Sequence, residues 1–119
     1  MRGDILTEIL EIFKALSDGN RYNLVSLLLK HDYCVGALAR KLSISESAVS
    51  QHLKILRNAG IVKGDKRGYY THYWVDRNLL NKAGIQIIEL SKISPSEDGC
   101  HKHNPQNQAC CRKEEDNNV

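Results

Sequence analysis

The sequence predicts a mainly α-helical fold that carries a β-hairpin, in the arrangement of a winged helix-turn-helix. Residues 34–42 and 43–59 have the patterns of two helices joined by a short turn, and residues 61–75 have that of a hairpin. A further apolar helix is expected on each side of this group, over residues 4–16 and 76–93. Two closely spaced helices followed by a hairpin are typical of this fold.

The second helix of the pair has clear start and stop signals. Ser43 and Glu46 form an S-x-x-E capping box, so the helix is expected to begin there. It should run to Asn58 or Ala59, because Gly60 can adopt the left-handed conformation that ends many helices. Its apolar residues recur at the spacing of one buried face, formed by Val49, Leu53 and Leu56.

The opposite face of this helix is short, polar and free of carboxylates. It is formed by Ser47, Ser50, Gln51 and Lys54. Serine and glutamine can donate hydrogen bonds to phosphates or base edges, and lysine can neutralise a phosphate. We interpret this segment as a DNA recognition helix, and an ordinary solvated helix face is the alternative. His52 lies toward the inner edge, where packing or a structural hydrogen bond is expected instead of a base contact.

The other elements follow from local patterns. The helix over residues 21–30 should be capped by Asp18 or Asn20, and a linker should follow at residues 31–33. The returning hairpin strand, residues 69–75, is rich in aromatic and β-branched residues. The basic hairpin tip is expected at Lys66, Arg67 and Gly68, and His72 and Trp74 should pack along the strand.

The first and last helices carry more apolar residues than so small a core can bury. In the first helix, Ile5, Ile9 and Ile12 form one stripe, and Leu6 and Leu10 add a second. The excess is expected to be buried against a second copy of the chain, in a two-fold homodimer.

Composition places the basic charge in the predicted domain. The chain has 119 residues and a net charge of +3. Residues 94–119 hold three of the 17 Lys and Arg residues and five of the 14 Asp and Glu residues, so residues 1–93 carry +5, as a DNA-binding surface requires. No apolar run has the length of a membrane span, and the N-terminus does not resemble a signal peptide, so a cytoplasmic protein is expected.

The composition changes abruptly at Ser94. We expect residues 1–93 to form the DNA-binding and dimerisation domain and residues 94–119 to form a flexible tail, because the tail has almost no aliphatic residues. The tail nevertheless holds three of the four cysteines together with two histidines, namely Cys100, Cys110, Cys111, His101 and His103. In a reducing compartment, such cysteines are expected to act as metal-binding or redox-active thiols.

Several stretches resemble the ArsR/SmtB family of small dimeric winged-helix repressors. These are FKALSDGNRYNLVSLL, YCVGAL, LSISESAVSQHLKILRNAGIV and KRGYYTHYWV, and the match as a whole extends over roughly residues 9–76. The resemblance implies a homodimer that binds an inverted-repeat operator and is released by a metal, a metalloid or another thiol-reactive inducer. It also implies DNA contacts from the recognition helix and the wing, namely Ser45, Glu46, Ser47, Ser50, Gln51, Lys54, Lys66 and Arg67.

The sequence departs from this family at two familiar sensing sites. Where many members have C-V-C, this chain has Cys34-Val35-Gly36 and keeps only the first thiol. Other members place Asp and His ligands along the last helix, whereas residues 78–93 contain no histidine and one carboxylate, Glu89. A third arrangement in the family gathers cysteines near the C-terminus, which Cys100 and the Cys110-Cys111 pair would match.

The chemistry of the tail favours soft ions. Three thiolates suit As(III) or Sb(III), and they also suit Cd(II), Zn(II) or Cu(I), with His101 or His103 completing a tetrahedral set for zinc or cadmium. Cys34 is a further candidate ligand or redox partner, and a small buried hydrophobe is its alternative. The tail could also be an appendage without coupling to DNA binding.

Two rival functions remain at this point. One is a redox-sensing repressor that is released when thiols such as Cys34 and a tail cysteine form a disulfide or a persulfide, and the other is a module that sequesters metal, with DNA binding incidental. The sequence contains no pattern typical of a catalytic site, so an enzyme is not expected.

Overall fold

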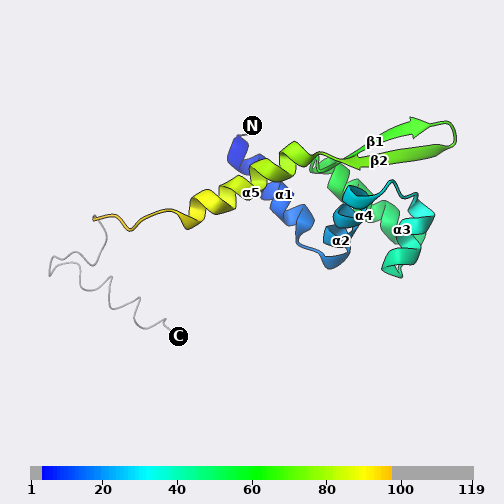
Figure 1. Ribbon diagram of the computed structural model, residues 1–119, viewed down its shortest axis with the longest axis horizontal. Coiled ribbons are helices and arrows are strands. Elements are labelled where there is room, and N and C mark those ends of the chain that lie inside the picture. The colour runs from blue at the N-terminus through cyan, green and yellow to red at the C-terminus, as the bar shows by residue number, and fades with distance from the viewer. Residues whose placement is uncertain (1–3, 98–119) are drawn as a thin grey trace. The chain divides into compact units, whose positions relative to one another are not determined.

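The computed structural model describes residues 4–97. Within them the order is α1 (Ile5–Leu16), α2 (Gly19–Lys30), α3 (Val35–Leu42), α4 (Glu46–Asn58), β1 (Val62–Arg67), β2 (Tyr70–Val75) and α5 (Arg77–Ser91) (Figure 1). This order and the antiparallel hairpin confirm the predicted winged helix-turn-helix. The described residues up to Ile88 form one compact unit, which holds the helix-turn-helix and the wing.

Short polar side chains begin three of the helices. An Asp4 carboxylate oxygen accepts from the Thr7 N–H at 2.9 Å, and Asp18 accepts from the Arg21 N–H at 3.1 Å, as one of the two predicted caps. The hydrogen bond from the Arg21 backbone holds the pKa of Asp18 below its ordinary value. Ser45 Oγ accepts from the Ala48 N–H at 3.0 Å at the start of α4.

The predicted capping box at Ser43 is therefore wrong by two residues. Ser43 ends α3 in the left-handed conformation, with φ of 58°, and Ser45 is the N-cap of α4. The tight reversal after α3 is the physical reason, because the Ile44 N–H turns back to the Ala39 carbonyl and only a left-handed residue allows this. The predicted end of α4 is confirmed, since Gly60 has φ of +82°.

The hairpin forms a wing whose register places Arg67 opposite Tyr70. The turn is therefore made by Gly68, with φ of +66°, and Tyr69. The sequence predicts Lys66 and Arg67 at the tip, but they are the last two residues of β1. The returning strand begins one residue later than predicted for the same reason.

A single apolar core joins the helices and the base of the wing. Its fully buried members are Ile12, Leu24, Leu38, Val49, Leu53, Leu56, Ile61 and Val62. The three residues predicted for the inner face of α4 are all among them, as the periodicity indicated.

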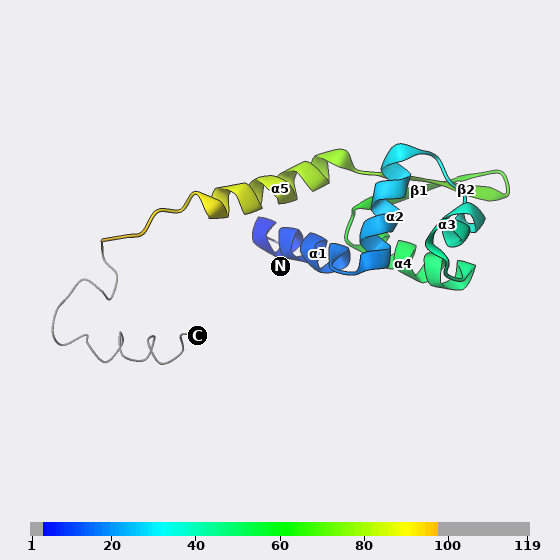
Figure 2. The ribbon, with the colours of Figure 1, turned by 60° about the horizontal axis from the view of Figure 1, so that its bottom comes forward.

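The apolar excess of the first and last helices lies on the surface, as the sequence predicted. α1 and the first part of α5 lie at an angle to each other (Figures 1 and 2), and residues of both helices line a groove of about 220 Å³. α5 buries only Ala83, whereas large side chains on both helices are 45–67% exposed, namely Ile5, Leu6, Leu10, Ile85, Ile87 and Ile88.

Candidate DNA-binding surface

The recognition helix α4 is held by its apolar face and presents its polar face to solvent. Val49, Leu53 and Leu56 are at most 2% exposed. The residues predicted to contact DNA from this helix and its cap are all exposed, namely Ser45, Glu46, Ser47, Ser50, Gln51 and Lys54. α3, which precedes α4 in the chain, packs against it (Figure 1). The exposed polar face of α4 is therefore available to enter a major groove.

The exposed groups can recognise both backbone and bases. The Gln51 amide can pair with an adenine edge through two hydrogen bonds, and Ser50 can donate to a base or a phosphate. Ser45 Oγ accepts the capping bond from Ala48, so its own O–H can still donate to a phosphate. The positively charged Lys54 side chain can neutralise a DNA phosphate.

Glu46 lies differently from the other predicted contact residues. A Cβ placed on Gly36 would be 3.3 Å from Glu46 Oε2 and 3.6 Å from an Arg40 guanidinium nitrogen. The carboxylate therefore lies beside the first turn of α3, with a cation nearby. This position can reduce its repulsion of a phosphate.

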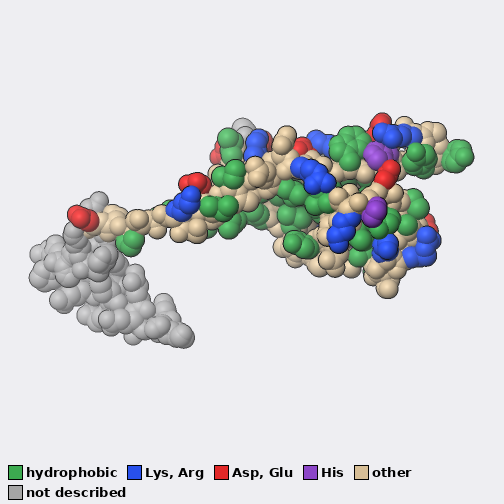
Figure 3. Space-filling model, in the orientation of Figure 1, with side chains coloured by type: hydrophobic (Ala, Val, Ile, Leu, Met, Phe, Trp, Pro, Cys, Tyr) green, Lys and Arg blue, Asp and Glu red, His purple; other side chains and the backbone are tan. Residues whose placement is uncertain are grey.

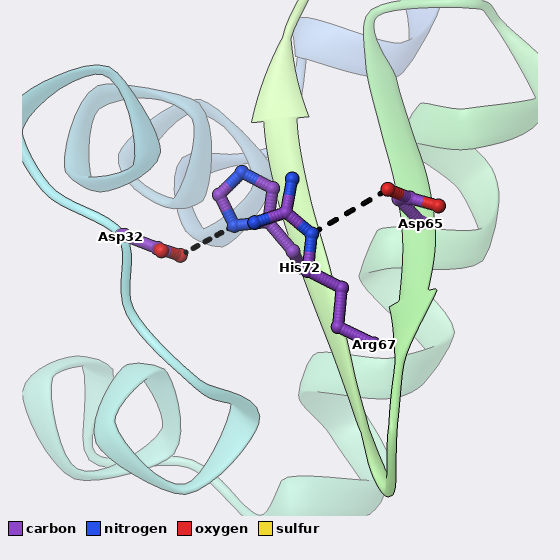
Figure 4. A network of polar contacts seen from close by, with 4 residues as sticks. All are labelled: Asp32, Asp65, Arg67 and His72. Atoms are coloured by element: carbon purple, nitrogen blue, oxygen red, sulfur yellow. Dashed lines mark hydrogen bonds and ion pairs between the residues drawn. The ribbon is translucent and has the colours of Figure 1, made fainter.

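The wing carries the second part of the predicted surface. Lys66 and Arg67 are exposed at the end of β1, and Arg67 Nε lies 3.5 Å from Asp65 Oδ2 (Figure 4). Both side chains of this pair are about half exposed, so it stabilises little, and Arg67 can exchange Asp65 for a phosphate. Tyr69 at the tip is fully exposed, and no pattern in the sequence singled it out as a contact residue.

Two contacts join the wing to the helices. His72 Nδ1 lies 2.9 Å from Asp32 Oδ1 in the loop after α2 (Figure 4), and the Arg57 guanidinium lies 5.9 Å from the Tyr73 ring centre. The predicted packing of His72 along the strand is confirmed by its stacking on Trp74, with ring centres 5.7 Å apart. No sequence pattern indicated Asp32, which is 40 residues away.

Basic side chains surround the recognition helix. Those that are exposed on α3, α4 and the wing are Arg40, Lys41, Lys54, Arg57, Lys63, Lys66 and Arg67. Lys and Arg side chains gather over the wing and around α3 (Figure 3). Such a surface attracts the phosphate backbone whatever the base sequence.

The predicted sensing residues lie partly inside and partly outside the described part of the chain. Cys34 is the N-cap residue of α3 and is exposed, so its interpretation as a small buried hydrophobe is wrong. Cys100, His101, His103, Cys110 and Cys111 lie outside the described residues. Among residues 4–97, no three His, Cys, Asp or Glu side chains are grouped closely enough to hold a metal ion.

Comparison with known proteins matches this architecture to one family. The family model for bacterial regulatory proteins of the arsR family matches residues 18–63, from the cap of α2 to the start of β1. The cadmium resistance transcriptional regulatory protein CadC homolog of Staphylococcus aureus is 33% identical over 91 residues, which cover 72% of this chain and 75% of that protein. The chain belongs to the arsR family.

Other members of the arsR family extend this result. The transcriptional repressor SmtB homolog of Synechocystis is 38% identical over 79 residues, or 66% of this chain, and the match spans only 60% of that protein. The structure of an ArsR-like transcriptional regulator from Rhodococcus sp. RHA1 superposes with a TM-score of 0.65 at 29% identity, over 72% of this chain and 81% of that one. These relatives are transcriptional regulators. Within residues 4–97 of this chain, no helix is long and apolar enough to cross a membrane.

Proposed function

We propose that this protein is a transcriptional repressor that binds operator DNA as a homodimer and is released by a soft, thiophilic inducer. The main support for DNA binding is that α4 exposes its polar face while its apolar face is buried in the core. The basic side chains around α4 and on the wing support it, because they can hold the phosphates on either side of a major groove.

The proposed dimer uses the exposed apolar side chains of α1 and α5. Leu6 and Leu10 are 59% and 47% exposed, and Ile85 is 45% exposed beside the groove between the two helices. A monomer that leaves such a patch in water would be prone to association. A two-fold axis through this patch would present two copies of α4 to the half-sites of an inverted repeat.

The proposed inducer site is formed by Cys100, Cys110 and Cys111. As(III) or Sb(III) is favoured because three thiolates match its pyramidal coordination, followed by Cd(II) or Zn(II) with His101 or His103. The proposal is supported by the sequence, which has three cysteines in twelve residues, and by the cadmium resistance named for one relative. Binding at this site would favour a dimer whose two recognition helices no longer match the groove spacing.

A redox-sensing repressor is the second candidate, and one observation favours it. Cys34 is exposed at the N-cap of α3, so an oxidant in solution can reach its thiol. In this case a peroxide or polysulfide would oxidise Cys34 and a tail thiol to a disulfide, and the oxidant would take up the two electrons.

Metal sequestration by the tail, independent of DNA, would instead appear as arsenite binding that leaves operator affinity unchanged.

The paired substitution Cys110→Ser with Cys111→Ser separates DNA binding from induction. We expect operator affinity to change less than about twofold, because the exposed face of α4 is untouched, and arsenite to lose its effect because the remaining thiol cannot hold the ion. Anisotropy of labelled operator DNA measures both. Cys34→Ser is the matched control and should respond to arsenite like the wild type. An unaltered arsenite response in the paired variant would contradict the proposed site.

A further inference from the structure

Arg21 is a half-buried cation whose side chain bonds to two other helices. It lies in the first turn of α2, where its backbone N–H donates to the Asp18 cap. Its Nε donates to the Ala15 carbonyl at 2.7 Å, and a terminal guanidinium nitrogen lies 3.4 Å from Nδ1 of His52. One side chain therefore connects the end of α1 with the middle of α4.

The contact at Ala15 completes the end of α1. The last four carbonyls of a helix have no partner within the helix, and they carry its negative partial charge. The Arg21 guanidinium satisfies one of them and places a positive charge there. Because two separate nitrogens of a rigid planar group are used, the direction of the second contact is fixed by the first.

The contact at His52 reaches the recognition helix from its inner side. Arginine can only donate, so the Nδ1 atom of His52 is the acceptor in this contact. This agrees with the structural hydrogen bond expected for His52. His52 directly follows Ser50 and Gln51, the residues proposed to contact DNA.

α1 contacts α4 through the apolar core, and the polar bridge adds a second connection between the two helices at the edge of that core. A surface cleft of about 310 Å³ lies beside this contact and is lined by Glu11, Lys14, Ala15, Arg21, Ile55, Asn58 and Ala59. Because side chains do not fill this space, the contacts of Arg21 with Ala15 and His52 hold the two helices together at this end of the core.

We propose that Arg21 is a positioning residue that sets the angle of the recognition helix relative to α1. The bridge runs from Ala15 through Arg21 to His52, and it links the helix that carries Leu6 and Leu10 of the proposed dimer interface to the helix that reads DNA. This inference rests on the proposed function. Specific binding needs two recognition helices at the right spacing, whereas non-specific binding needs mainly positive charge. Loss of the bridge therefore lowers the affinity for the operator and leaves the affinity for other DNA nearly unchanged.

The test compares specific with non-specific DNA for the full-length protein. An inverted-repeat duplex selected by the wild type from a random pool serves as the operator, and a scrambled duplex of equal length and composition serves as non-specific DNA. We expect Arg21→Ala and His52→Leu each to lower operator affinity about tenfold or more, with scrambled-DNA affinity changed less than about twofold. The double variant should lose no more than the worse single variant, because both remove one bridge.

Two further variants separate positioning from general damage. His52→Asn supplies a carbonyl oxygen near the place of Nδ1, and it should restore most of the specificity that His52→Leu loses. Arg77→Ala is the matched control, because Arg77 also donates to a carbonyl near a helix end, Leu29, at 3.1 Å, but from α5. It should leave the specificity ratio unchanged.

The outcomes distinguish this inference from the proposed function. If Arg21→Ala does not fold, His52→Leu carries the test, because it leaves the bond between Arg21 and Ala15 in place. Equal losses on operator and scrambled DNA, or a specificity ratio unchanged in His52→Leu, would overturn the positioning role. A wild type that prefers no DNA sequence would instead overturn the proposed function, and the inference with it.

Discussion

Replacing Ser50 and Gln51 together by alanine is expected to lower operator affinity by about 100-fold or more. Each good base contact is worth about 1–3 kcal/mol, and the proposed dimer would present both side chains twice. Both residues are exposed on α4, so their removal opens no cavity and should leave the melting temperature nearly unchanged. Anisotropy titrations of the selected operator at fixed salt measure the loss.

The control for this prediction is a polar change elsewhere on the surface. Asn23 is exposed on α2, and Asn23→Ala removes an amide without touching the face of α4. It should bind the operator like the wild type. If the variant with Ser50→Ala and Gln51→Ala kept its operator affinity, α4 would present an ordinary solvated face. Arsenite binding should be unchanged both in this variant and in Asn23→Ala.

Placing charges on the apolar face of α1 is expected to produce monomers that lose operator affinity. Leu6 and Leu10 are about half exposed in a single chain, so Leu6→Glu with Leu10→Glu costs that chain little, but in a dimer it would bury four unpaired carboxylates. Affinity should fall about 100-fold or more, because a monomer engages one half-site without the gain from linking two. Sedimentation velocity gives the assembly state, and anisotropy gives the affinity.

A second exposed apolar side chain controls for this change. Tyr22 on α2 is 62% exposed and lies outside the groove between α1 and α5, so Tyr22→Glu should remain a dimer. A dimer that persists in the Leu6→Glu, Leu10→Glu variant would place the interface elsewhere.

The sequence predicted elements that depend on local chemistry. The periodicity of Val49, Leu53 and Leu56 predicted the buried face of α4, and Gly60 predicted its end, because a left-handed residue is needed where the chain leaves the helix. The exposed apolar side chains of α1 and α5 were also predicted, since their number exceeds what a small core can hold.

Features that depend on distant partners could not be predicted in this way. Ser43 and Ser45 are equally good caps by composition, and only the return of the chain after α3 decides between them. The bonds of His72 to Asp32 and of Arg21 to His52 join residues 40 and 31 positions apart, so no local pattern indicates them. The Cys100, Cys110 and Cys111 site stays a prediction, because it lies outside the described residues.

Release of the operator by arsenite decides whether the protein is a thiol-based metalloid sensor. The anisotropy of a labelled operator bound to the reduced 119-residue protein is followed as arsenite is added. Parallel titrations use Cd(II), Zn(II) and Cu(I). We expect release at about one equivalent of arsenite per protomer, since each tail holds one set of three thiols. Retention of the DNA with all of these ions, together with release by peroxide or polysulfide, would contradict it and establish the redox-sensing alternative.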